Sequence, residues 1–221
     1  MNATLGDALD TLGEFSWVLL GLVATHAAVQ VRKYQDTYPT GGVQHVLRGV
    51  LATVWFGVGS ALAQALILGE PPESVIVPVA ACVAAYACVT YCPRDIPYTL
   101  SQTPAVNALL IVGLEVCRAL CVGVGVNSAL KVYSGNAVMA AAIGILRGSW
   151  GWALGRPGAK VILGRSIADV SWPAPPVSTP AASVAAVLLT MATSQTDAQR
   201  IIAGLIAVLV AWRSYELFNA N

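Results

Sequence analysis

Charged side chains are scarce in this sequence. Of its 221 residues, 10% are Asp, Glu, Lys or Arg, whereas 57% are hydrophobic. Because a soluble domain carries roughly a quarter charged residues, this composition excludes an ordinary soluble protein. The formal net charge of +1 also lacks the basic excess typical of nucleic-acid binding. We therefore expect an integral membrane protein whose partners include membrane lipid and no nucleic acid.

Several kinds of site are missing as well. The sequence has no Gly-x-Ser-x-Gly elbow, no phosphate-binding glycine loop and no His-Glu-x-x-His helix, which argues against an enzyme. Its five cysteines are odd in number and lie in or beside apolar runs, so neither a disulfide framework nor a metal site is expected. They are interpreted as small packing residues. No basic segment precedes the first apolar run, which is expected to remain in the mature protein.

What the sequence does contain is a series of long apolar runs. A hydrocarbon core about 30 Å thick is crossed by roughly 20 helical residues. About seven segments of suitable length occur, near residues 15–31, 46–68, 75–91, 104–126, 134–155, 177–196 and 199–218. The basic, proline-rich stretch at about 156–176 is interpreted as a loop. The predicted fold class is therefore an all-α integral membrane protein, with a single transmembrane domain over residues 1–221.

Basic residues are unequally distributed between the two predicted faces of the membrane. With seven spans, the face that includes the N-terminus carries only Lys131 and Arg200. The opposite face carries the remaining cations outside the spans: Arg32, Lys33, Arg48, Arg94, Arg156, Lys160, Arg165 and Arg213. The positive-inside rule then predicts a cytoplasmic C-terminus and an N-terminus in the lumen or outside.

The ends of the second and fifth predicted spans resemble each other. Residues 68–72 read Leu-Gly-Glu-Pro-Pro, and residues 154–158 read Leu-Gly-Arg-Pro-Gly, so both are interpreted as helix stops. A shift by three spans reverses the direction of the chain in the membrane. Two inverted repeats are therefore predicted, at about 15–100 and 104–196, with a seventh helix at 199–218.

Two ionisable residues, Glu115 and Arg118, lie near the middle of the fourth span. Each costs at least ~2.5–3.5 kcal/mol at the bilayer centre on insertion scales, and their i, i+3 spacing allows them to pair. They form either a neutralised packing pair or part of a polar pathway, with Arg118 the stronger pathway residue. Arg147 in the fifth span poses a similar choice between a pathway and snorkelling to the interface.

Glycines lie close to these positions. Gly57 and Gly59 occupy the middle of the second span, and Gly144 and Gly148 flank the arginine of the fifth. Such glycines allow close helix packing, whereas a bend at them would expose carbonyls to a water-filled passage. Both interpretations stay open. His26, within the first span, is either a hydrogen-bonded packing residue or a proton relay.

The run from Glu115 to Gly151 resembles the fourth and fifth helices of trimeric intracellular cation (TRIC) channels. It contains an acidic-Val-x-Arg element at 115–118, Gly-Val at 125–126, a tyrosine at 133 and Ile-Gly-x-x-basic-Gly at 143–148, without a gap. Residues 69–72 resemble the Glu-Pro pair that closes the second helix of this family, and residues 92–95 resemble its Pro-x-Asp after the third. Together these elements cover most of residues 46–155.

The resemblance implies a homotrimer with one hourglass pore in each protomer. It implies potassium conduction across endoplasmic or sarcoplasmic reticulum as counter-ion flow for calcium release, through a pathway that includes Arg118, Arg147 and Glu115 together with the glycines above. It also implies phosphatidylinositol bisphosphate at Arg118 and Gly125, and no covalent cofactor. Leu114 and Cys121 stand where the family pattern has basic residues, so weaker phosphoinositide retention is expected. The alternatives are an inverted-repeat secondary transporter for a small solute and a non-conducting scaffold.

Overall fold

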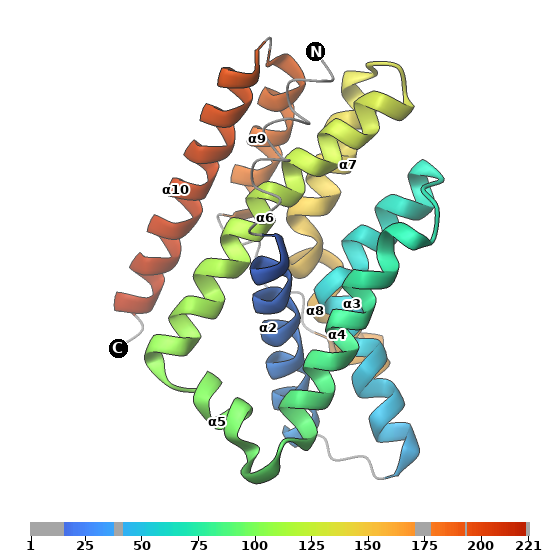
Figure 1. Ribbon diagram of the computed structural model, residues 1–221, viewed down its shortest axis with the longest axis vertical. Coiled ribbons are helices and arrows are strands. Elements are labelled where there is room, and N and C mark those ends of the chain that lie inside the picture. The colour runs from blue at the N-terminus through green and yellow to red at the C-terminus, as the bar shows by residue number, and fades with distance from the viewer. Residues whose placement is uncertain (1–15, 38–41, 171–177, 193, 220–221) are drawn as a thin grey trace.

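The structure, a computed structural model, describes residues 16–37, 42–170, 178–192 and 194–219, and these residues contain helices and no strand. In chain order the α-helices are α2 (Ser16–Thr37), α3 (Val43–Leu68), α4 (Glu73–Tyr91), α5 (Ile96–Ser101), α6 (Pro104–Val132), α7 (Ala137–Trp150), α8 (Arg156–Ile162), α9 (Ser178–Met191) and α10 (Gln195–Asn219) (Figure 1). The π-helical segment η3 (Gly151–Gly155) joins α7 to α8, and two 3-10 turns are η2 (Pro93–Asp95) and η4 (Ile167–Asp169).

Local signals set several of these boundaries. Gly69 ends α3 in the left-handed conformation, with φ of 65°, and its N–H bonds to the carbonyl of Ala65. Glycine is favoured there because it has no Cβ to clash. Asn136 begins α7, since its side chain accepts hydrogen bonds from the N–H groups of Val138 and Met139. The helix stop predicted at residues 68–72 is therefore confirmed.

Each predicted span coincides with a helix, although α9 in the sixth span has only 14 residues. Within the described residues, four helices are long and apolar enough to cross a membrane: Val43–Leu68, Glu73–Tyr91, Pro104–Val132 and Ala137–Ile162. The predicted ends differ in places, because α2 continues to Thr37 and α6 to Val132, whereas α9 ends at Met191. The total of seven spans stays a prediction.

The helix stop predicted at residues 154–158 is wrong. The helix continues through η3 into α8, so the predicted loop at 156–176 begins with seven helical residues; residues 171–177 of that loop lie outside the described residues. Pro157, which has no N–H to donate to the preceding turn, follows η3 directly and lies in the first turn of α8. Residues 68–72 and 154–158 are therefore not equivalent helix ends, and the sequence similarity no longer supports the inverted repeat.

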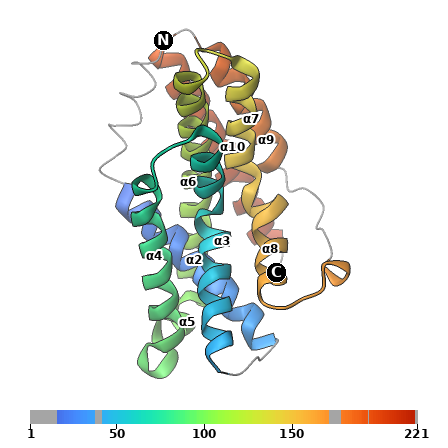
Figure 2. The same cartoon turned by 90° about the vertical axis from the view of Figure 1, so that its right-hand side faces the viewer.

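The helices pack in two groups. One consists of α2, α3 and α4, and the other of α6, α7 and α9, with α10 packed on α6 and α9. α8 leaves the second group and packs on α3, as Figure 2 shows. The connections α3–α4, α6–α7 and α9–α10 lie in the upper part of Figure 1, while α5 and the end of α2 lie at the bottom, so successive long helices alternate in direction.

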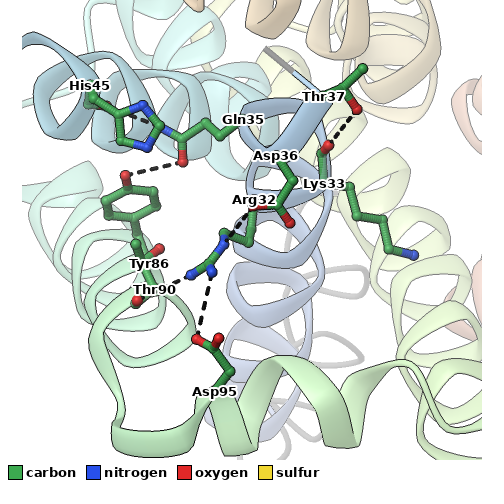
Figure 3. Close-up of polar contacts among 9 residues, drawn as sticks. All are labelled: Arg32, Lys33, Gln35, Asp36, Thr37, His45, Tyr86, Thr90 and Asp95. Carbon is green, nitrogen blue, oxygen red and sulfur yellow. Dashed lines mark hydrogen bonds and ion pairs between the residues drawn. The ribbon is translucent and has the colours of Figure 1, made fainter. Parts of the chain in front are cut away.

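A polar network fixes the lower end of the first group (Figure 3). Arg32 donates to the Asp36 carboxylate and to the Thr90 carbonyl, each at 3.1 Å, and its Nη2 lies 3.6 Å from Asp95. Its guanidinium also lies 5.3 Å from the centre of the Tyr98 ring. Burial raises the pKa of the Tyr98 phenol, so the ring stays neutral beside this cation. The end of α2 is thereby tied to α4, η2 and α5.

A second set of bonds ties α2 to the start of α3. Gln35 donates from Nε2 to the carbonyl of His45 at 2.9 Å, and the Tyr86 hydroxyl donates to Gln35 Oε1 at 3.2 Å. Figure 3 shows both residues turned toward Gln35. The buried amide thus has a partner at each end, as a buried polar group requires.

Candidate functional site

Two cavities lie inside the bundle and adjoin each other. The first, of about 150 Å³, has walls from α2, α3, α6, α7, η3 and α8 and is called here the basic cavity because Arg118, Arg147 and Arg156 line it. The second, of about 220 Å³, lies among α2, α3, α4, α6 and α7 and is called the apolar cavity. The residues that line both are Val23, Gly57, Ser60, Cys117, Cys121 and Arg147.

Arg147 stands where the two cavities meet. Its Nη2 donates to the Cys121 sulfur at 3.5 Å, and its buried Nε has no hydrogen-bond partner in the described part of the chain. The guanidinium therefore points toward α6 inside the bundle and does not snorkel to the interface. A buried donor without a partner is rare, and it indicates a water, an ion or a ligand. The geometry favours the pathway interpretation of Arg147.

Glu115 and Arg118 form the pair that their spacing predicts. Arg118 Nη1 donates to Glu115 Oε2 at 2.8 Å, with the Glu115 side chain 0% exposed and that of Arg118 12% exposed. Only Arg118 lines the basic cavity. The buried Glu115 carboxylate thus holds the Arg118 guanidinium in place. The pair neutralises its own charges, and its arginine forms part of the wall of the basic cavity.

The π segment η3 shapes the end of the basic cavity. Trp55 donates from Nε1 to the Leu154 carbonyl at 2.9 Å, and Trp150 donates from Nε1 to the Trp55 carbonyl at 2.9 Å. The two indole rings lie 4.8 Å apart. π segments interrupt the i, i+4 bonding of an α-helix and are frequent at functional sites. Through these bonds α3 holds the backbone of η3 and the cavity residue Trp150 in place.

All four predicted glycines serve close packing. A Cβ on Gly57 would lie 2.9 Å from the Cys82 sulfur, and one on Gly148 would lie 2.6 Å from Ala182. A Cβ on Gly59 would lie 2.5 Å from the Trp150 ring, and one on Gly144 would lie 2.7 Å from Val126. Gly57 and Gly148 also line the basic cavity. α3 and α7 continue without a break past their glycines. Neither helix is interrupted at Gly59 or Gly144, and an irregular segment follows α7 at η3.

Sequence reasoning missed several cavity residues. Cys117 and Cys121, interpreted as packing residues, line both cavities with their sulfurs 3.9 Å apart. Their i, i+4 spacing is the signal that places them on one face. His26 and Ser60 also line the basic cavity. Gly125 does not, because it packs against the Cγ of Arg147, which would lie 2.9 Å from a Cβ there.

Comparison with known proteins agrees with this arrangement. The sequence profile of the family described as TRIC channel matches residues 45–216. The chain belongs to the TRIC channel family. This TRIC protein is accordingly a multi-pass membrane protein of a channel family and not of an enzyme family. A comparison with curated proteins gives no match.

Solved TRIC structures share the fold. A trimeric intracellular cation channel from C. elegans without Ca²⁺ superposes with a TM-score of 0.77 at 18% identity, covering 97% of this chain and 96% of that one. The C. elegans channel with bound Ca²⁺ gives 0.74 at 21% identity, covering 94% of each chain. A structure described as explaining the activity of TRIC counter-ion channels in calcium release gives 0.67 at 15% identity, covering 90% and 93%.

Proposed function

We propose that this TRIC protein is a homotrimeric potassium channel of an endoplasmic or sarcoplasmic reticulum membrane that supplies counter-ion current for calcium release, with one pore in each protomer. The observation that supports it is the pair of adjoining cavities within a single chain, which meet at Gly57, Ser60, Cys121 and Arg147. One structural relative is described as a counter-ion channel in calcium release.

The junction between the basic cavity and the apolar cavity is where ion flow through this pore is controlled. A cation passing it meets Arg147, while the charge of Arg118 is balanced by Glu115 at 2.8 Å. Like charges repel strongly where water is scarce. Arg147 therefore sets the barrier to potassium in this conformation, and Gly57 and Gly148 keep the opposing helices close to it. Three further glycines act indirectly, by leaving space for a neighbouring side chain. Gly59 leaves space for Trp150, Gly144 for Val126, and Gly125 for the Arg147 side chain.

The membrane arrangement is part of the same proposal. α2, α3 and α4 form one repeat and α6, α7 and α9 the inverted other, with α10 outside both, since each trio packs within itself. The N-terminus lies in the lumen and the C-terminus in the cytoplasm. A phosphatidylinositol bisphosphate headgroup contacts Arg118. Leu114 and Cys121, which replace basic residues of the family pattern, line the same cavity and weaken that contact.

The function is tested by single-channel recording of purified protein in a planar bilayer, with potassium on one side and sodium on the other. We expect current without any coupled substrate gradient, with the reversal potential displaced from zero in the direction that shows a higher permeability for potassium than for sodium. A secondary transporter would instead show solute-dependent, saturable flux. A bilayer that stays silent for current while solute uptake is coupled to an ion gradient would overturn the channel in favour of the transporter.

The two cavity cysteines allow a second test. A cationic methanethiosulfonate reagent that reaches Cys117 or Cys121 adds a positive charge beside Arg147, so we expect it to remove most of the current. The Cys117→Ser, Cys121→Ser variant should resist the reagent. Cys88→Ser is the matched control, because Cys88 is exposed and lines neither cavity, and it should stay sensitive. Equal block of all three proteins would place the pathway elsewhere.

A further inference from the structure

A third cavity lies at the lower end of the bundle, apart from the other two. It has a volume of about 320 Å³ and shares no lining residue with the basic or the apolar cavity. Its walls come from the end of α2, the first turns of α3, α8 and the turn after α8. We call it the end pocket, and its lining residues are Tyr34, Thr37, Arg48, Lys160, Leu163, Gly164 and Arg165.

The end pocket is strongly basic. Arg48, Lys160 and Arg165 line it, and no carboxylate of the described residues does. Within the described residues, neither Arg48 nor Lys160 forms an ion pair. Asp36 is the acid beside Thr37 in sequence, but Arg32 holds its carboxylate at 3.1 Å (Figure 3). The charges of Arg48 and Lys160 therefore lie in this pocket without a neutralising group among the described lining residues.

Neighbouring residues influence where two of these cations lie. Lys160 Nζ lies 5.4 Å from the centre of the Tyr34 ring, which places the ammonium over an aromatic face. Gly164 has φ of +104°, a conformation that side chains rarely adopt, and Arg48 Nη1 lies 2.8 Å from where its Cβ would be. The absent side chain thus leaves the space that the Arg48 guanidinium occupies. Fixed donors lose less freedom when a ligand binds.

This chemistry fits a phosphorylated anion. A guanidinium presents paired N–H donors that match phosphate oxygens, and an ammonium adds a point charge. Basic pockets between helices at the cytoplasmic side of a membrane recruit anionic headgroups, and this is the end predicted to be cytoplasmic. We propose that the end pocket binds an anion with more than one phosphate group, either a phosphorylated lipid headgroup or its free counterpart, and so joins α8 to the ends of α2 and α3.

The proposal is tested on the purified full-length protein by native mass spectrometry with dioctanoyl phosphatidylinositol bisphosphate. Loss of one cation near a membrane surface weakens anion binding by about fivefold. We therefore expect the Arg48→Gln, Lys160→Gln, Arg165→Gln variant to bind on the order of a hundredfold more weakly, by the same rule applied three times. Arg48→Lys keeps the charge but loses the paired donors, and its affinity should lie in between.

Two control variants separate this pocket from other basic positions. Lys33→Gln makes the same charge change on the same end of α2, but Lys33 lines none of the three cavities and points away from the network in Figure 3. Its affinity should stay within about twofold of wild type, because a half-buried charge outside the pocket is screened by salt and contributes little. Arg118→Gln tests the pore-associated site separately. The end pocket is refuted if affinity follows Arg118 or Lys33 and not the three pocket cations.

A measurement on the unaltered protein guards against misfolded variants. Acetylation of lysines, read by peptide mass spectrometry, should be suppressed at Lys160 by the lipid and unchanged at Lys33. Equal labelling of Lys160 with and without ligand would overturn the proposal. Inositol trisphosphate supplied alone distinguishes the two sources. Protection by it identifies a soluble anion, and protection by the lipid only identifies a headgroup held at the membrane; both support the pocket. A failed bilayer recording would leave this result standing, since the pocket is separate from the pore.

Discussion

Replacing Arg118 with alanine is expected to destabilise the protein by about 3–5 kcal/mol, because it leaves a buried carboxylate without its cation. Glu115 is 0% exposed and receives the Arg118 guanidinium at 2.8 Å. Thermal unfolding of the detergent-solubilised protein measures the loss. Arg200→Ala is the matched control, since it breaks another i, i+3 pair, to Asp197 at 3.9 Å, with Arg200 77% exposed. A surface pair of this kind contributes little, and similar losses in both variants would contradict the role of burial.

The double variant Glu115→Ala, Arg118→Ala separates structure from conduction. Removing both charges relieves the stranded carboxylate, so assembly should recover. Arg118 also lines the basic cavity, and we therefore expect conductance or open probability to stay abnormal in the recovered protein. Full recovery of current together with assembly would show that the pair only stabilises packing.

Gly59→Leu is expected to lower single-channel conductance sharply while the oligomer still assembles. A Cβ at this position would lie 2.5 Å from the Trp150 ring, whose indole is fixed by its bond to the Trp55 carbonyl. The ring must shift, and Trp150 is part of the basic cavity. Overpacking of this kind costs about 1–3 kcal/mol. Conductance is read in the bilayer and assembly by native mass measurement.

Gly21→Ala is the control for this change. Gly21 is also helical, but no atom of the described residues outside its own helix backbone lies within 4 Å of its Cβ position. Alanine there should stabilise the helix by roughly 0.5–1 kcal/mol and leave the current unchanged. Unaltered conductance in Gly59→Leu would mean that the Trp150 ring can move without affecting the pathway.

The sequence predicts those features whose cause is local or energetic. Hydropathy places the long helices, because each apolar run must be long enough to cross a hydrocarbon layer. The i, i+3 spacing predicts the pairing of Glu115 with Arg118, and insertion cost singles out Arg147 as a residue that needs a polar environment. All three are present in the structure.

Features decided by distant partners were not predictable. Residues 154–158 have the local signature of a helix end. In the structure, however, Trp55 donates a hydrogen bond to the carbonyl of Leu154, 99 residues away, and so stabilises the π conformation. Cys117 and Cys121 have the same small apolar character in a packed core as in a cavity wall. Their position beside Arg147 depends on how α6 packs against α7. The end pocket likewise depends on how α8 packs against α3.

The π turn η3 also constrains the length of the chain between residues 150 and 156. A π turn holds about one residue more than an α turn, so every later side chain is rotated by about 100° around the helix axis. This rotation is consistent with the packing of the continuous rod formed by α7, η3 and α8. Its α7 part packs against α6 and α9, and its α8 part packs against α3. The number of residues in this stretch thus sets the direction of the α8 side chains, whatever those residues are. Arg147 of the basic cavity and Lys160 of the end pocket therefore lie on one uninterrupted helical stretch of the chain.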